Sequence, residues 1–145
     1  ATAGGVEVHT QRNEGYQAER LILCSGGWSP KLLGLEPELK VTRQYSGWLW
    51  PSRPSDFGPA SFPVFAIEVP AGEFGRTRTG LFYGFPMNDA EVGFKCAVHA
   101  PGEPIDPDAS GCPTSEQLHD AAEEFLRPLR AFVPDARGPL LSNRT

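Results

Sequence analysis

The stretch YGFPMNDAEVGFKCAVH, residues 83–99, has the pattern of a β-hairpin, because two runs of β-forming residues flank a polar, turn-forming centre. Alternate residues of a strand share a face, so the second run separates into two sets. We expect the apolar set to face a core: Val92, Phe94, Cys96 and Val98. The opposite set mixes small and titratable residues that leave room for a flat molecule against the sheet: Gly93, Lys95, Ala97 and His99.

Tyr83 is the third residue of this stretch that could join a site on the Lys95 face. It lies on that face if residues 87–91 form a five-residue connection, which places Tyr83 opposite Lys95. A four-residue connection would instead pair Tyr83 with Phe94 and turn it toward the core. Lys95 and His99 should lie roughly 13 Å apart along the strand. The alternation of residues along this strand by itself favours an ordinary solvent-exposed face, since most polar faces of antiparallel sheets contact only water.

Outside this hairpin, the rest of the chain predicts an antiparallel sheet with one helix. β-forming runs occupy residues 40–50, 62–69 and 80–86 and are joined to the run at 92–98 by loops, which indicates antiparallel pairing. Thr114 and Gln117 have the pattern of a capping box, and apolar residues follow at helical spacing: Leu118, Ala121, Ala122, Phe125, Leu126 and Leu129. Pro128 should kink or end this helix. We therefore predict an α+β fold with a helix packed on an antiparallel sheet.

The N-terminal residues predict a small hairpin and then a buried strand. Residues 6–10 alternate in polarity before the turn RNEG, and the continuous apolar run LILC at 21–24 is typical of a strand buried on both faces. The turn after it contains Gly26 and Gly27, which permit a ligand to approach the backbone closely and should lead into a short helix. A plain strand-to-helix turn explains these glycines equally well. The chain contains no glycine-rich phosphate-binding motif.

The composition narrows the classes of function. The 145 residues, 39% of them hydrophobic, suffice for one ordinary domain, and neither the formal net charge of −5 nor any Lys/Arg cluster favours nucleic acid or anionic lipid as a partner. No apolar run is long enough to span a membrane. Cys24, Cys96 and Cys112 form no CxxC pair, as in a reduced cytoplasmic protein, and no metal-ligand spacing occurs. The missing initiating Met and the ending LLSNRT lead us to expect a fragment.

Six segments of the chain resemble, in order, the monomeric sarcosine oxidase and N-methyltryptophan oxidase family of FAD-dependent amine oxidoreductases: LILCSGGWSPKLLGL, TRQYSGWLW, FPVFAIEVPAG, GLFYGFP, VGFKCAVHAPGEPIDPD and RAFVPDARGPLL. The segments YGFP and GFKCAVH are the most specific. The resemblance implies that an antiparallel substrate domain covers a flavin held by a Rossmann-type FAD domain. On this basis, residues 1–35 would hold the last strands of a Rossmann-type FAD-domain segment, and residues 36–145 an incomplete substrate (catalytic) domain.

The resemblance also implies roles for particular residues. Lys95 matches a lysine that lies over the flavin ring and promotes the reaction of reduced flavin with O₂, where a fixed cation in a water-poor pocket stabilises developing negative charge. Tyr83 matches an active-site tyrosine, and His99 matches a histidine close to the substrate amine. These three are the expected catalytic residues. Lys95 would also belong to the cofactor-binding set, with three residues of the N-terminal turn: Ser25, Gly26 and Trp28.

The function implied by the resemblance is oxidation of the C–N bond of a secondary (N-methyl) amino acid such as sarcosine, with release of H₂O₂. The partners would be a small-molecule amine and O₂, and FAD would be attached through a cysteine outside residues 1–145, so the fragment alone should be inactive. The family pattern between Pro86 and Lys95 is Gly-rich and one residue shorter than MNDAEVGF, which leaves the substrate open. The alternatives are an FAD-dependent dehydrogenase, an oxidase of another amine, or a non-catalytic binding module.

Overall fold

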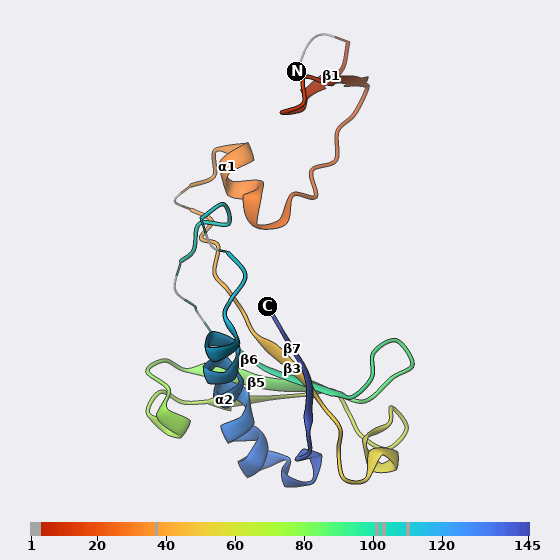
Figure 1. Cartoon of the computed structure of the whole chain (residues 1–145), viewed down its shortest axis with the longest axis vertical. Coiled ribbons are helices and arrows are strands. Elements are labelled where there is room, and N and C mark those ends of the chain that lie inside the picture. The colour runs from red at the N-terminus through yellow and green to blue at the C-terminus, as the bar shows by residue number, and fades with distance from the viewer. Residues whose placement is uncertain (1–3, 37, 101, 103, 110) are drawn as a thin grey trace. The chain divides into compact units, whose positions relative to one another are not determined.

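The computed structural model describes residues 4–36, 38–100, 102, 104–109 and 111–145. The chain divides into two compact units, Ala1–Lys40 and Val41–Thr145, each described by itself below (Figure 1). Among the described residues, no helix combines the length and the apolar character that crossing a bilayer requires. The assignment of the two parts of the chain to an FAD domain and a substrate domain stays a prediction.

The first unit begins with the predicted hairpin. Strands β1 (Val6–His9) and β2 (Gly15–Ala18) pair in antiparallel fashion, and the backbone N–H of Thr10 donates to the carbonyl of Glu14 across the turn at 2.9 Å. After residues 19–25 comes a 3₁₀ turn, η1 (Gly26–Trp28), which continues directly into helix α1 (Ser29–Leu33). Gly34 ends α1 in the left-handed conformation, with φ of 64°, so the predicted short helix is confirmed.

The predicted buried strand at residues 21–24 is absent from the described structure. Leu21, Ile22, Leu23 and Cys24 form no strand and are exposed, Ile22 by 86%. The prediction rested on apolar composition, but a strand also needs a neighbour for its N–H and C=O groups. No strand among the described residues of this unit pairs with residues 21–24. That residues 1–35 belong to a Rossmann-type domain stays a prediction, without a strand at residues 21–24.

The described residues of the second unit form a five-stranded sheet in the order β4-β5-β6-β3-β7, with antiparallel pairing throughout. This confirms the predicted α+β fold with an antiparallel sheet. Strand β7 was not predicted, because LLSNR is short and its apolar residues do not alternate. Strand β6 occupies the middle of the sheet. The strands are β3 (Ser46–Leu49), β4 (Phe65–Val69), β5 (Gly80–Phe85), β6 (Phe94–His99) and β7 (Leu140–Arg144).

Three strands start later than their residue patterns predicted. Strand β3 was expected from residue 40, but Thr42 makes only an isolated bridge with Pro104. Strand β4 was expected from residue 62 and begins after Pro63, which has no N–H to donate to a ladder. Strand β6 was expected from Val92, which is instead 71% exposed outside the strand, so its assignment to the core is wrong. Gly93 interrupts the extended backbone there with φ of 109°.

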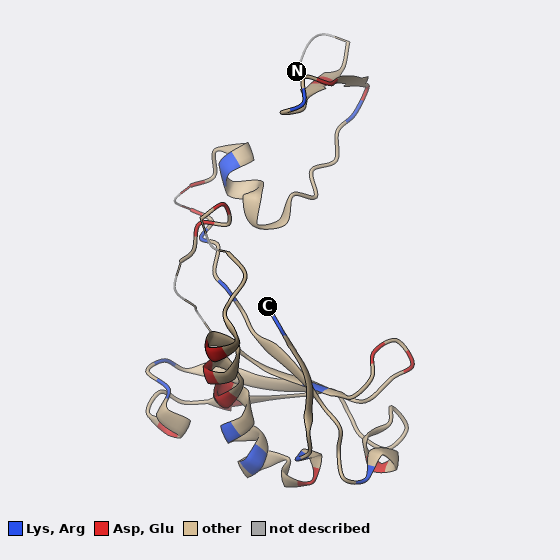
Figure 2. Cartoon of the chain, in the orientation of Figure 1, with Lys and Arg blue, Asp and Glu red and all other residues tan. Residues whose placement is uncertain are grey.

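Helix α2 (Ser115–Phe132) is the long helix of the second unit. The predicted capping box is confirmed, because the N–H of Gln117 donates to Thr114 Oγ1 at 3.2 Å and the N–H of Thr114 donates to Gln117 Oε1 at 2.9 Å. The helix does not end at Pro128, which is buried within its last turns. Acidic residues occupy the first half of α2 and arginines the second (Figure 2), which complements the helix dipole. Three 3₁₀ turns complete the unit: η2 (Pro54–Phe57), η3 (Glu73–Gly75) and η4 (Pro134–Ala136).

Helix α2 covers one face of the sheet (Figure 1), and the core lies between them. Gly47 of β3 permits this close approach, since a Cβ atom there would fall 2.4 Å from the Phe125 ring of α2. The core contains inward-facing residues of β5 and β6: Phe82, Phe94, Cys96 and Val98. Because side chains alternate along a strand, burying Phe94 against α2 turns Lys95 to the opposite, open face.

Candidate functional site

Lys95, Tyr83 and His99 lie on the same face of the sheet, opposite α2. In the β5–β6 ladder, Phe85 pairs with Lys95, Tyr83 with Ala97 and Leu81 with His99. Directly opposite residues share a face, so Tyr83 stands between Lys95 and His99, across from Ala97. The structure therefore brings the three predicted catalytic residues onto one surface, which we call the open face. Their catalytic roles stay predictions.

The connection between β5 and β6 matches neither of the two alternatives that the sequence left open. It consists of residues 86–93, eight residues rather than five or four, and Phe85 lies opposite Lys95. Asn88 shapes this connection, because its Oδ1 accepts hydrogen bonds from the backbone N–H groups of Ala90 at 2.8 Å and Glu91 at 3.2 Å. The observed register is shifted by two residues from that of the five-residue alternative. A shift of two keeps the face of every side chain, so Tyr83 still lies on the Lys95 side.

Small and aromatic residues make up the centre of the open face. Ala97 lies between Lys95 and His99 on β6. It is only 2% exposed, because the longer side chains around it stand above its methyl group. Tyr83 and Phe85 stand beside it on β5 with their ring centroids 5.8 Å apart. His99 is exposed at the end of its strand. This surface thus carries a cation at one end and an imidazole at the other, with two aromatic rings between them on β5.

Aromatic rings flank the Lys95 ammonium. Its Nζ lies 4.8 Å from the centroid of the Trp48 ring and 5.9 Å from that of Phe85. Trp48 faces Lys95 directly across the β3–β6 ladder. The residue pattern did not reveal this pair, because Trp48 and Lys95 lie on strands far apart in the sequence and only the ladder register brings them together. Trp48 is thus a residue of the candidate site that was missed.

The cofactor-binding residues predicted in the first unit lie around the turn η1. Ser25 Oγ is hydrogen-bonded to Ser29 Oγ at 2.9 Å, which ties the turn to the first residue of α1. Gly26 has a φ of 54°, and a Cβ atom placed there would meet nothing within 4 Å. Trp28 is exposed. The turn therefore offers open space beside its backbone, as a ligand-binding turn requires, and the binding role of these residues stays a prediction.

The cysteines offer no activated nucleophile among the described residues. Cys96 faces the core, as predicted, and burial raises the pKa of its thiol well above the ordinary range. A protonated, buried thiol is unreactive. Cys24 and Cys112 are exposed. In the described part of the chain, no group of three or more His, Cys, Asp or Glu side chains is placed to hold a metal ion.

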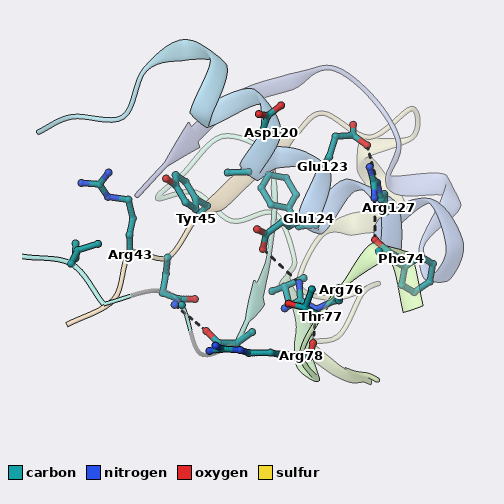
Figure 3. Close-up of a pocket in the computed structure, with 18 residues that line it drawn as sticks. Arg43, Tyr45, Phe74, Arg76, Thr77, Arg78, Asp120, Glu123, Glu124 and Arg127 are labelled. Atoms are coloured by element: carbon teal, nitrogen blue, oxygen red, sulfur yellow. Dashed lines mark hydrogen bonds and ion pairs between the residues drawn. The ribbon is translucent and has the colours of Figure 1, made fainter. Parts of the chain in front are cut away.

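A cavity of about 530 Å³ lies on the helix side of the sheet and contains none of the predicted site residues (Figure 3). Two arginines and two glutamates of its lining form ion pairs. Arg76 lies 3.6 Å from Glu124, and Arg127 lies 3.6 Å from Glu123 and donates to the carbonyl of Phe74 at 3.2 Å. These contacts tie η3 to α2, so we assign a structural role to the two arginines and two glutamates that make them.

A second hollow, of about 560 Å³, adjoins the open face beside Trp48. The residues 90–92 of the β5–β6 connection and Arg144 of β7 line it. Because Trp48, Ser142 and Arg144 share the side of the sheet that carries Lys95, this hollow extends the open face toward β7.

Comparison with known proteins shows what the chain is similar to. It is 33% identical over 139 residues to monomeric sarcosine oxidase from Bacillus sp. (strain B-0618), a match that covers 93% of this chain and 33% of that protein. It is 32% identical over 123 residues to N-methyl-L-tryptophan oxidase from Escherichia coli O1:K1 / APEC, covering 83% of this chain and 29% of that protein. The chain spans about a third of the length of the curated relatives it matches. No family profile matches it.

Monomeric sarcosine oxidase from Streptomyces avermitilis is a further relative, 29% identical over 145 residues that cover 97% of this chain and 35% of that protein. Several relatives with these two names thus match most of the chain at similar identity. The resemblance to the sarcosine oxidase and N-methyltryptophan oxidase group is confirmed.

Proposed function

From this similarity we propose that the chain forms part of an FAD-dependent oxidase of N-methyl amino acids, with the open face directed at the flavin and the substrate. The observation that carries the proposal is the match to two kinds of oxidase, both named for N-methyl amino acids, over 93% and 83% of the chain. In the proposal, residues 1–35 belong to an FAD domain and residues 36–145 to a substrate domain.

The residues of the open face fit a flavin. A flat ring system can lie over Ala97, where Tyr83 and Phe85 supply aromatic contact on the neighbouring strand. Lys95 supplies a positive charge to this surface, and no carboxylate among the described residues lies within ion-pair distance of it. When bound, FAD supplies the redox chemistry, in which a hydride leaves the carbon next to the amine nitrogen and O₂ is finally reduced to H₂O₂.

The proposed task of Lys95 is electrostatic. A fixed ammonium in a site from which water is excluded stabilises the negative charge that develops on O₂ as it takes up electrons. Ala97, the residue between Lys95 and His99 on this face, adds no further charge beside the ammonium. Tyr83 and His99 carry groups that can hydrogen-bond a small zwitterionic substrate, and we assign them to substrate orientation.

Three further parts of the proposal rest on the sequence alone, the first two on the resemblance and the third on the cysteines. FAD is attached covalently through a cysteine outside residues 1–145, the partners are a small amine and O₂, and the protein acts in the cytoplasm. The turn that contains Ser25, Gly26 and Trp28 contributes to holding the cofactor, which is consistent with the open space beside Gly26.

The experiment is to purify the full-length protein that contains this chain and to record its visible spectrum and its turnover. We expect flavin absorbance, and H₂O₂ formation with sarcosine or N-methyl-L-tryptophan when O₂ is the electron acceptor. Turnover with an artificial dye but not with O₂ would identify a dehydrogenase and overturn the oxidase assignment. A colourless protein that binds no added FAD would overturn the flavoenzyme and favour a binding module.

A further inference from the structure

We infer that Trp48 is a positioning residue for Lys95: its ring fixes the ammonium above the open face and leaves the positive charge unneutralised. The placement of the ammonium follows from the geometry of the sheet alone. Its consequence for the reaction with O₂ rests on the proposed function, and the two parts are tested separately below.

The sheet register puts an aromatic residue on each side of Lys95. Trp48 is its direct partner on β3, and Phe85 is its direct partner on β5. All three side chains therefore share the open face, and both rings lie within about 6 Å of Nζ, the range over which a cation is attracted to an aromatic ring. Trp48 is the closer of the two, at 4.8 Å, and an indole attracts a cation more strongly than a phenyl ring.

An aromatic ring holds a cation in a different way from a carboxylate. A carboxylate paired with Lys95 would also restrict the ammonium, but its negative charge would cancel the field that a bound anion experiences. The ring attracts the ammonium through its quadrupole and carries no net charge. No ion pair of Lys95 exists among the described residues, so the observed contacts restrict the flexible four-carbon chain while the full charge remains.

The Trp48 ring is itself held in place. It is only 5% exposed, and the guanidinium of Arg144 lies 4.7 Å from its centroid. Arg144 forms an ion pair with Glu91 at 3.0 Å, which fastens the β5–β6 connection to β7. The carboxylate of Glu91 is therefore paired with Arg144, whereas the Lys95 ammonium contacts two aromatic rings. Gly93 allows the connection to pass this close, because a Cβ atom there would lie 3.3 Å from Trp48 Cβ and 2.9 Å from the carbonyl oxygen of Leu49.

The placement can be tested by NMR on the full-length protein without added cofactor, with Lys31 and Lys40, the other two lysines of residues 1–145, as references. In a protein labelled with ¹³C at the lysine side chains, the Lys95 signal is assigned from its loss in Lys95→Arg. Protons that lie over an aromatic ring shift upfield, so we expect the Lys95 Hε signals upfield of those of the other two lysines. Trp48→Leu should abolish most of this shift, Trp48→Phe should retain part of it, and Phe85→Leu should change it least.

Two results would overturn the inference. One is an Hε shift of Lys95 in the unsubstituted protein that equals those of Lys31 and Lys40, a result that needs only the assignment variant Lys95→Arg. The other is a shift that survives in Trp48→Leu while the signals of core residues such as Phe94 stay in place. If Trp48→Leu does not fold, the ordering of Trp48→Phe and Phe85→Leu decides the matter.

The consequence for the reaction is measured in the flavin-loaded, full-length protein by stopped-flow. We expect Trp48→Leu to slow reoxidation by O₂ roughly tenfold, with flavin reduction by the substrate changed much less, and Trp48→Phe to recover part of the loss. Equal losses in both half-reactions would mean a merely structural role for Trp48 and would overturn the inference. If the NMR shift is present but Lys95→Met reoxidises at the normal rate, the positioning stands and the proposed role of Lys95 in the reaction with O₂ fails.

Discussion

The two faces of strand β6 differ in what holds their side chains. Phe94, Cys96 and Val98 point to α2 and are fixed by close packing in the core. Lys95 points the other way, and its polar end is fixed by rings that stand on the strands to either side. The side chains of one strand can thus be held in two different ways: by close packing on one face, and by contact of a cation with aromatic rings on the other. Substitutions on the first face should therefore change stability, and substitutions on the second should change chemistry.

The largest expected effect comes from testing adjacent residues on opposite faces. Phe94 is fully buried, and its ring centroid lies 5.3 Å from that of Phe57 and 5.5 Å from that of Phe62. Phe94→Ala should lower the free energy of unfolding by about 3–5 kcal/mol, because it removes the ring and leaves a cavity. Lys95→Ala, one residue further, should cost less than about 1 kcal/mol. Urea unfolding followed by circular dichroism measures both, and equal losses would break the contrast between the faces.

A smaller effect tests how tightly the helix is packed on the core face. Gly47→Ala would bring a Cβ atom within 2.4 Å of the Phe125 ring, so we expect a loss of about 1–3 kcal/mol from overpacking. Gly58→Ala is the matched control, since its φ is −76° and a Cβ atom there meets nothing within 4 Å. The control should be neutral or slightly stabilising. If Gly47→Ala unfolded at the same urea concentration as Gly58→Ala, the close approach of α2 would be disproved.

A smaller effect again is expected at the capping box of α2, the helix that covers the core face. Thr114→Ala removes the hydroxyl that accepts from the N–H of Gln117, and should lower the unfolding free energy by about 1 kcal/mol. Thr114→Ser keeps that hydroxyl and should remain within a few tenths of a kcal/mol of the unsubstituted protein. Thermal unfolding distinguishes them. An alanine variant as stable as the serine variant would show that the cap does not stabilise α2.

The smallest effect lies on the solvent side of α2. Nη1 and Nη2 of Arg130 each donate to one carboxylate oxygen of Glu123 at 3.0 Å, and this pairing is the main reason that the pKa of Glu123 is lowered. A lowered folded-state pKa means that the stabilisation is present above the ordinary Glu pKa of about 4.3 and is lost as the pH falls through the folded-state value. Glu123→Gln should therefore cost about 0.3–0.5 kcal/mol at pH 7 and less at pH 3. A cost that is the same at both pH values would contradict the ion pair.

Local signals in the sequence predicted the core face better than the open one. The capping box of Thr114 and Gln117 and the apolar spacing of α2 are contained within a few residues, so the helix was found, although Pro128 did not end it. Strand β7 was missed and residues 21–24 were wrongly predicted as a strand for the same reason: pairing depends on a neighbour that the local pattern does not contain.

The arrangement of the candidate site depended on registers that residue patterns do not determine. Alternation along β6 placed Lys95 and His99 together, whereas the face of Tyr83 depended on the length of a connection that the sequence left open. The contact of Trp48 with Lys95 depended on the pairing of β3 with β6, which no local pattern specifies. The roles of the three predicted catalytic residues remain predictions.

The most direct test of the central claim, that the open face serves a reaction with O₂, is a stopped-flow comparison of Lys95→Met with the unsubstituted full-length flavoprotein. Methionine keeps an unbranched side chain and removes the charge. We expect the rate of reoxidation by O₂ to fall by about 10²–10³-fold, the effect of removing one preorganised electrostatic group, with the rate of flavin reduction by the amine nearly unchanged. Reoxidation at the normal rate in Lys95→Met would contradict the claim.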